Sequence, residues 1–79
     1  MAFYIFKVWR DKAPAGSGGL ELLHTFPYAP LNEAAMYRRA ETRLRELRRV
    51  ADPRGGYYLH LVYGDDERDA EDRLLAKLG

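Results

Sequence analysis

Two histidines are the first side chains in this sequence that could do acid–base or metal chemistry. A histidine titrates near neutral pH and is a common metal ligand. His24 and His60 each alternate with apolar neighbours in separate β-rich segments. In the strand order argued below, they fall on opposite edges of the sheet and on opposite faces. We therefore expect neither a shared metal site nor an acid–base pair, and no enzymatic activity.

A run of arginines is the second candidate. Between residues 38 and 49, six arginines stand against two glutamates, a local net charge of +4. Guanidinium groups bind phosphates well, and this attraction does not depend on sequence. Arg38, Arg45 and Arg49 lie on one side of the helix expected here, so they are candidate phosphate contacts of a weak nucleic-acid-binding protein. The alternative is a solvated helix face with internal ion pairs, partly neutralised by the acidic segment or a neighbouring subunit. The overall charge of +1 favours this alternative.

Carboxylates form the third candidate. Between residues 65 and 72, six acids stand against Arg68, a local net charge of −5. Their spacing lacks the pattern of a calcium-binding loop, and the glycines at 16–19 precede no phosphate-loop lysine. The chain has no cysteine, so disulfides and thiolate metal sites are excluded. We expect no metal and no cofactor.

The first β-segment, residues 3–10, organises the other elements. It is rich in aromatic and β-branched residues, and both of its alternating sets are largely apolar. An edge strand, or one with a solvated face, would instead alternate apolar and polar residues. This segment is therefore expected to lie at the centre of the sheet, although its two sets are too alike to show which one faces the helices.

Residues 11–19 contain one proline, one serine and three glycines and are expected to form a flexible loop. The second strand is expected over residues 20–26, antiparallel to the first, because a short connection allows no crossover. The third strand is expected over residues 57–63.

A helix is expected from Asn32 or Glu33 to Ala51, with Asn32 as its N-cap and Leu31 packed on Met36 as a hydrophobic staple. An apolar stripe with helical spacing runs along it, formed by Met36, Ala40, Leu44, Leu47 and Ala51. A second helix is expected after Asp65 or Asp66, which would cap it. Its buried line is expected at Ala70, Leu74 and Leu78.

The order of elements is β-β-α-β-α, in a single domain that spans residues 1–79. The third strand could pair with the second strand or with the free side of the first, and the two-sided apolar first strand favours the latter. The expected fold is therefore an α+β two-layer sandwich. Its three-stranded antiparallel sheet has the order 2-1-3, and both helices lie on one face. The residues expected to face the helices are Tyr4, Phe6 and Val8 of the first strand, unless that strand is inverted, with Leu20, Leu22 and Phe26 of the second and Leu59 and Leu61 of the third.

The helix-free face of such a sheet would expose a large apolar surface, which often marks an interface. A chain this short also buries only about 60% of its unfolded surface and gains from a partner. We therefore expect a non-enzymatic interaction or accessory module that forms a homodimer through this face and could also serve a larger protein. The candidate interface residues are Phe3, Ile5, Trp9, Leu23, Tyr58, His60 and Val62. Base stacking on Trp9, Tyr58 and His60 is less favoured, because no RNP-like stretch accompanies them.

Location follows from what the sequence does not contain. No basic, apolar and small-residue series typical of a signal peptide opens the chain, and no apolar run is long enough to span a bilayer. We expect a cytoplasmic protein with no membrane partner.

Three stretches carry a resemblance to a family: FYIFKV at residues 3–8, LELLHTF at 20–26 and VYGDDERDAEDRLL at 62–75. Together they resemble a family of small uncharacterised bacterial proteins with an aromatic first strand, an L-E-x-x-x-T-F second strand and a C-terminal A-E-x-L-L helix. The loop at 11–19 and the Pro-Tyr-Ala-Pro segment depart from that pattern. The resemblance implies a fold and no known activity. The strand, strand, T-F and helix order is also similar in a generic way to the arm-binding DNA domains of phage integrases.

Overall fold

The computed structural model describes residues 1–9, 19–52 and 54–78, without the side chain of Leu78. Its elements are strands β1 (Ala2–Trp9) and β2 (Leu20–Pro27), helix α1 (Glu33–Val50), strand β3 (Tyr57–Gly64) and helix α2 (Glu67–Leu78). Each begins and ends within one or two residues of the position expected from the sequence. The predicted loop at 11–19 lies outside the described residues, apart from Gly19.

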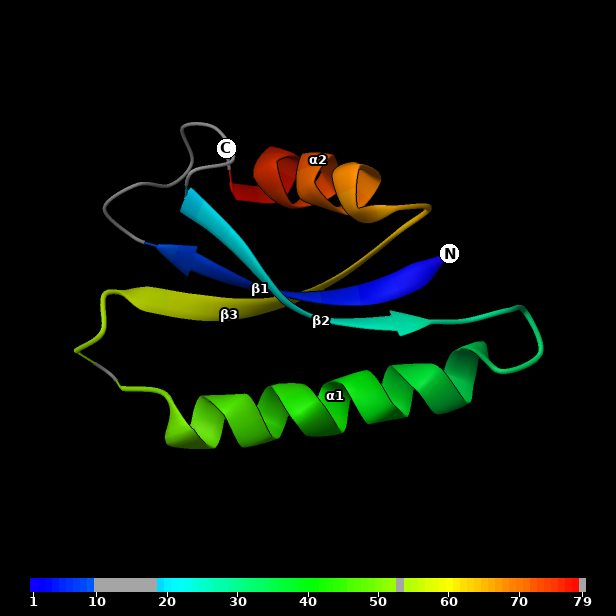
Figure 1. Cartoon of the computed structure of the whole chain (residues 1–79), viewed down its shortest axis with the longest axis horizontal. Coiled ribbons are helices and arrows are strands. Elements are labelled where there is room, and N and C mark those ends of the chain that lie inside the picture. The colour runs from blue at the N-terminus through cyan, green and yellow to red at the C-terminus, as the bar shows by residue number, and fades with distance from the viewer. Residues whose placement is uncertain (10–18, 53, 79) are drawn as a thin grey trace.

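The three strands form one open antiparallel sheet with the order β2-β1-β3 (Figure 1). The α+β class and the strand order are thus confirmed. β1 is the central strand, and its residues from Ala2 to Phe6 and Val8 are all buried. This is the burial expected of a strand that is apolar on both sides.

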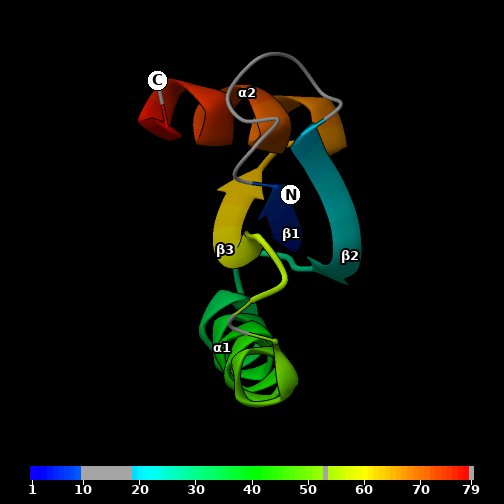
Figure 2. The same ribbon diagram turned by 90° about the vertical axis from the view of Figure 1, so that its left-hand side faces the viewer.

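The two helices lie on opposite faces of the sheet, with α1 on one side and α2 on the other (Figures 1 and 2). The prediction that both would share one face of a two-layer sandwich is therefore wrong. Its premise was that one apolar side of β1 would stay uncovered by helix. Since both sides of β1 are apolar, burying both stabilises the monomer more than leaving one exposed.

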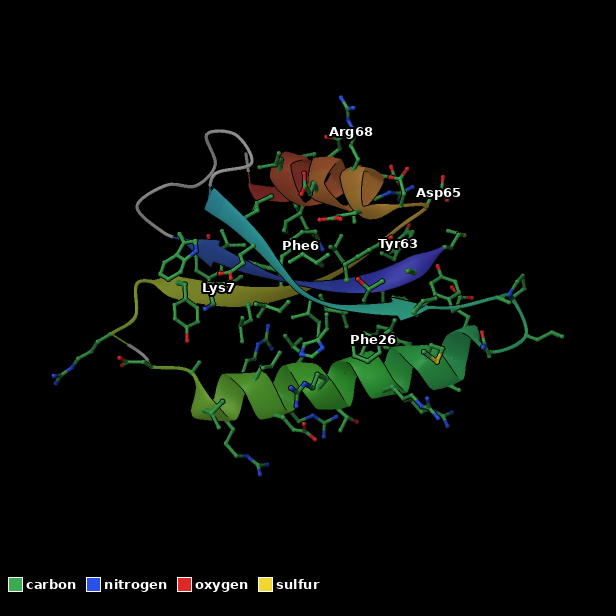
Figure 3. The ribbon with its side chains drawn as sticks, viewed as in Figure 1. Phe6, Lys7, Phe26, Tyr63, Asp65 and Arg68 are labelled. Atoms are coloured by element: carbon green, nitrogen blue, oxygen red, sulfur yellow. The ribbon has the colours of Figure 1, made fainter. Side chains whose placement is uncertain are left out.

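Two separate core clusters show the same arrangement. On the α2 side, Tyr4, Phe6 and Val8 of β1 pack with Ala70 and Leu74. On the α1 side, Ile5 packs with Leu44 and Leu59, and with partly buried residues of β2, α1 and β3. Figure 3 shows Phe6 between the sheet and α2, and Phe26 between β2 and α1. Alternate residues of one strand thus enter two different cores.

A bulge in β2 divides its apolar residues between the two faces. The pairing with β1 shifts between Ile5 and Phe6, which pair with His24 and Leu22, so Leu23 is the extra residue. A bulge of this kind places two residues of one strand opposite one of its partner. Leu20 and Leu22 consequently pack on the α2 side, whereas Leu23 and Phe26 pack on the α1 side.

The bulge and the β3 pairing correct two face assignments made by simple alternation. The sequence prediction grouped Leu20, Leu22 and Phe26 on one face, which the bulge separates. It also grouped Leu59 and Leu61 with Tyr4, Phe6 and Val8. In the structure, Leu59 and Leu61 pair with Lys7 and Ile5, and both pack on the α1 side.

α1 buries the predicted stripe, with Ala40 and Leu44 buried and Leu47 partly buried. Asn32 is its N-cap residue but makes no side-chain cap. Its Oδ1 instead accepts a hydrogen bond from the backbone N–H of Ala29 at 2.7 Å. Leu31 is fully exposed, so the predicted staple with Met36 does not form. Neither helix of the described part has the length and apolar character needed to cross a membrane.

α2 starts with the cap expected from the sequence. The Asp66 side chain accepts a hydrogen bond from the Asp69 backbone N–H at 2.8 Å, and the Asp69 side chain accepts one from the Asp65 N–H at 2.9 Å. Ala70 and Leu74 of the predicted buried line are buried. The end of β3 lies close to the first turn of α2, since a Cβ added at Gly64 would be 2.6 Å from the Ala70 backbone nitrogen.

This close approach predicts the effect of Gly64→Ala. The backbone of Gly64 is not in the left-handed region, so alanine costs nothing in conformation and only its methyl group is at issue. That methyl must push α2 away from β3, so we expect the free energy of unfolding to fall by about 1–3 kcal/mol in urea denaturation. Gly55→Ala is the matched control, because its methyl would chiefly meet the ring of Tyr57, a side chain that can move. Equal losses for the two variants would contradict this account.

Candidate functional site

The two histidines lie where the sequence predicted, on different strands and opposite faces. His24 of β2 pairs with Ile5 on the α1 side, and its Nε2 accepts a hydrogen bond from Arg43 Nε at 3.2 Å. His60 of β3 pairs with Phe6 on the α2 side. Within residues 1–9, 19–52 and 54–78, no three histidine or carboxylate side chains converge as metal ligands would.

His60 is partly buried on the α2 side of the sheet. Its Nε2 is buried and has no hydrogen-bond partner in the described part of the chain, and its ring meets the edge of Tyr58 at a centroid distance of 4.9 Å. Burial lowers the pKa of His60 below its ordinary value of 6.5, and the positive charges of Arg48 and Lys77 lower it further. This environment disfavours the protonated ring.

The seven predicted interface residues do not form one surface. Phe3, Ile5, Trp9 and Leu23 lie on the α1 side, and Tyr58, His60 and Val62 lie on the α2 side. Phe3 and Ile5 are buried, so they offer almost no area to a flat interface with a second subunit. The seven were assigned to one face on the premise that both helices would cover the other. Because each face carries a helix, this assignment is wrong.

The predicted phosphate contacts do share an exposed surface. Arg38, Arg45 and Arg49 are all exposed on α1, and none makes a hydrogen bond or ion pair with another described residue. The acidic segment lies with α2 on the opposite face of the sheet (Figure 2). It is therefore too remote to neutralise these arginines, which was one of the alternatives to phosphate binding.

A cavity of about 420 Å³ opens at the outer edge of β3, the side of this strand that none of the other described strands pairs with. Its volume is in the usual range for ligand-binding clefts. The lining residues come from β1, α1, β3 and α2 and are Phe3, Tyr37, Leu61, Val62, Tyr63, Arg73, Ala76 and Lys77. We call this cavity the edge groove.

Aromatic rings build the α1 side of the edge groove. Phe3 stacks on Tyr28 at a centroid distance of 4.5 Å and meets Tyr37 edge-on at 5.3 Å. Tyr37 and Tyr63 are 43% and 48% exposed, which is high for large side chains beside a packed core. Rings held in this way present apolar area that is already ordered before a ligand arrives.

Cations build the α2 side. The Arg73 guanidinium lies over the Tyr63 ring at 4.7 Å, and its Nε donates to Asp69 Oδ2 at 3.0 Å. Two hydrogen bonds, first from the Asp65 backbone and then from Arg73, hold the pKa of Asp69 below its usual range. Lys77 is exposed and makes no ion pair within the described residues. None of the described residues that line the groove is a carboxylate.

The edge groove is not among the sites predicted from the sequence. Of its residues, only Phe3 and Val62 were singled out, and for a different surface. The groove assembles from four elements, so no local motif could show it. The one available signal was the aromatic content at the ends of two elements, Tyr37 and Tyr63.

The lowered pKa of His60 predicts a pH-dependent stability. Between the native and unfolded pKa values, the unfolded chain binds a proton that the native state does not. The free energy of unfolding therefore falls as the pH drops below about 6.5. Urea denaturation at pH 7.5 and 5.5 checks this, with His60→Gln as the variant that should lose less stability over this interval. An equal loss of unfolding free energy in the wild type and in His60→Gln would show that His60 is not the cause of the pH dependence.

Comparisons with known proteins identify no relative. No family model matches the chain, and neither a curated protein nor a solved structure matches it significantly. The resemblance to small bacterial proteins therefore stays a prediction. What the chain does must be argued from its own surface.

Proposed function

We propose that this protein is a small non-enzymatic interaction module that binds another protein in the edge groove. The observation that carries the proposal is the groove itself, an apolar and aromatic hollow of about 420 Å³ beside an unpaired strand edge. Exposed aromatic rings and arginine are the side chains most enriched where proteins bind one another. The groove offers both, on rigid elements of the fold.

This proposal replaces the homodimer expected from the sequence. That dimer required a bare sheet face, and a helix now occupies each face of the sheet. The short chain also has less need of a second subunit than its length suggests, because β1 takes part in two cores. We therefore expect a monomer in solution, which light scattering checks directly. A mass twice that of the chain would contradict this expectation.

Ala76→Glu tests the groove as a binding surface. Ala76 is exposed on α2 and lines the groove, so a glutamate there fills it and adds a negative charge without disturbing the core. Ala35→Glu is the matched control, at an exposed position of α1 outside the groove. We expect partner proteins captured from a native lysate by the wild type and by Ala35→Glu to be lost from Ala76→Glu, as counted by mass spectrometry. A set of captured proteins that is the same for all three baits would contradict the proposal.

Nucleic-acid binding by α1 is a second candidate function. The fold supports it better than the sequence alone, because it separates the basic helix from the acidic one. Arg38, Arg45 and Arg49 stand free of carboxylate partners in the described chain, and the acidic helix is on the other side of the sheet. A hollow of about 370 Å³ beside Phe26, Arg38 and Arg39 adds a recess to this surface. Such a surface would bind duplexes through phosphates, without reading their sequence.

Replacing these three arginines by glutamine tests the second candidate. If α1 binds phosphates, the wild type should retard a short DNA duplex at low salt, and binding should weaken steadily as salt rises. The triple variant should then bind at least about tenfold more weakly, since each phosphate contact contributes to affinity. Arg68→Gln is the control, because Arg68 is exposed and points away from the sheet on α2 (Figure 3). Equal retardation by the triple variant and the control would exclude α1 as the binding surface.

A further inference from the structure

The outer edge of β3 is not uniformly open. Arg48 Nη2 of α1 donates to the carbonyl oxygen of Leu59 at 3.1 Å. A carbonyl that points to β1 is engaged by the sheet ladder, whereas one at the outer edge is left to other donors, so we take the Arg48 bond as a sign that Leu59 aims its carbonyl at the free edge. Alternate residues of a strand direct their backbone groups to the same side, so Leu61 and Tyr63 present theirs at that edge too.

The open half of the edge is the half that borders the groove. Leu61, Val62 and Tyr63 line it, and no side-chain hydrogen bond of the described residues reaches their backbone groups. Unpaired N–H and C=O groups at a sheet edge are a template for one further strand. Arg48 thus covers the first part of the edge and leaves the second part available.

α2 forms a wall beside this open half. The helix crosses the strands, and its C-terminal end lies beyond β3 (Figure 2). Ala76 and Lys77 come from this end and face the groove with Leu61 and Val62 of the strand. A strand added to β3 would therefore lie beside α2, where alternate side chains meet the aromatic side and the helix side of the groove.

The charges of the groove determine what kind of strand fits. Among the described residues its lining contains two cations and no carboxylate, and Arg73 is already paired with Asp69. Lys77 is the cation without an ion-pair partner in the described chain. A carboxylate on the incoming segment would satisfy it, as a charge-assisted contact at the rim of an apolar site.

A second copy of this chain does not fit the same edge. Antiparallel pairing of β3 with its own copy uses a two-fold axis perpendicular to the sheet, which keeps each face on its own side. The two α1 helices would then lie on the same face of the joined sheet, each with a local charge of +4. Like charges set against each other across an interface oppose association.

We infer that the edge groove binds an extended peptide segment of another protein, which adds as a strand to the C-terminal half of β3 and places a carboxylate at Lys77. The inference rests on the proposed function and names the partner's chemistry. Backbone hydrogen bonds to Leu61 and Tyr63 supply affinity, and Lys77 selects segments that carry an acid. The carboxylate comes from a chain terminus or from an aspartate or glutamate.

The experiment uses synthetic peptides with the whole chain. The probe is acetyl-Lys-Thr-Val-Thr-Val with a free C-terminal carboxylate, compared with its C-terminal amide, an amide that ends in glutamate, and an acid N-methylated at alternate residues. Two-dimensional NMR of the ¹⁵N-labelled protein gives the affinity and the place of binding. We expect the free acid, the glutamate amide or both to bind about tenfold more tightly than the plain amide. Shifts should be centred on Leu61, Tyr63 and Lys77, and N-methylation should abolish binding.

Two variants separate the charge from the strand pairing. Lys77→Gln should remove the advantage of the carboxylate and leave the affinity for the plain amide unchanged, whereas Arg68→Gln should change neither. Three results would overturn the inference: equal affinity for the acid, the glutamate amide and the plain amide, undiminished binding of the N-methylated peptide, or no binding of any peptide.

The capture experiment with Ala76→Glu separates a failure of the strand inference from a failure of the proposed function. Partner proteins lost from that variant without peptide binding would overturn the strand inference alone, and no groove-dependent capture would overturn the proposed function as well.

Discussion

The burial of β1 on both of its faces is the constraint from which the rest of the structure follows. Ile5, Phe6 and Val8 are completely inaccessible to solvent, and they achieve this by entering two cores on opposite sides of the sheet. Fully burying one such side chain stabilises the fold by about 1.5–3 kcal/mol, so neither face can stay bare without a large loss. Each helix is consequently needed. α1 closes one core and α2 closes the other, in a chain too short to build a single thick one.

The strand order could be predicted from this property. A strand whose two alternate sets of side chains are both apolar is expected at the centre of a sheet, with one strand paired at each of its edges. The same property is satisfied either by a helix on each face or by one helical face and a second subunit, and the sequence alone does not show which of the two buries the second face. Simple alternation then failed in β2, where the bulge at Leu23 moves His24 and Phe26 to the face opposite Leu20 and Leu22. A bulge leaves no clear signature in the residues themselves. Register is set by packing against both neighbours, which the sequence does not display.

Of the candidate sites, the arginine surface could be predicted from the sequence and the edge groove could not. Charged side chains on an exposed helix face could be predicted, since helical periodicity alone places Arg38, Arg45 and Arg49 together and solvent keeps them there. The edge groove could not, because it depends on where α2 ends relative to β3, and helix direction after a turn is a tertiary property. The sequence shows that basic and acidic residues are separated along the chain, but only the fold shows that they lie on opposite faces of the sheet. With the basic and acidic helices on opposite faces, neither neutralises the other, and each surface can act through its own field.

The contact between Gly64 and Ala70 links the core to the groove. It fixes the first turn of α2 against the end of β3, where the absence of a side chain lets the two backbones approach closely. From that point the helix must lay Ala70 and Leu74 on the sheet, and this requirement determines its direction across the strands. Its C-terminal turns then pass beyond β3 and carry Lys77 to the open edge. The packing that completes the α2 core is therefore also what builds one wall of the binding groove.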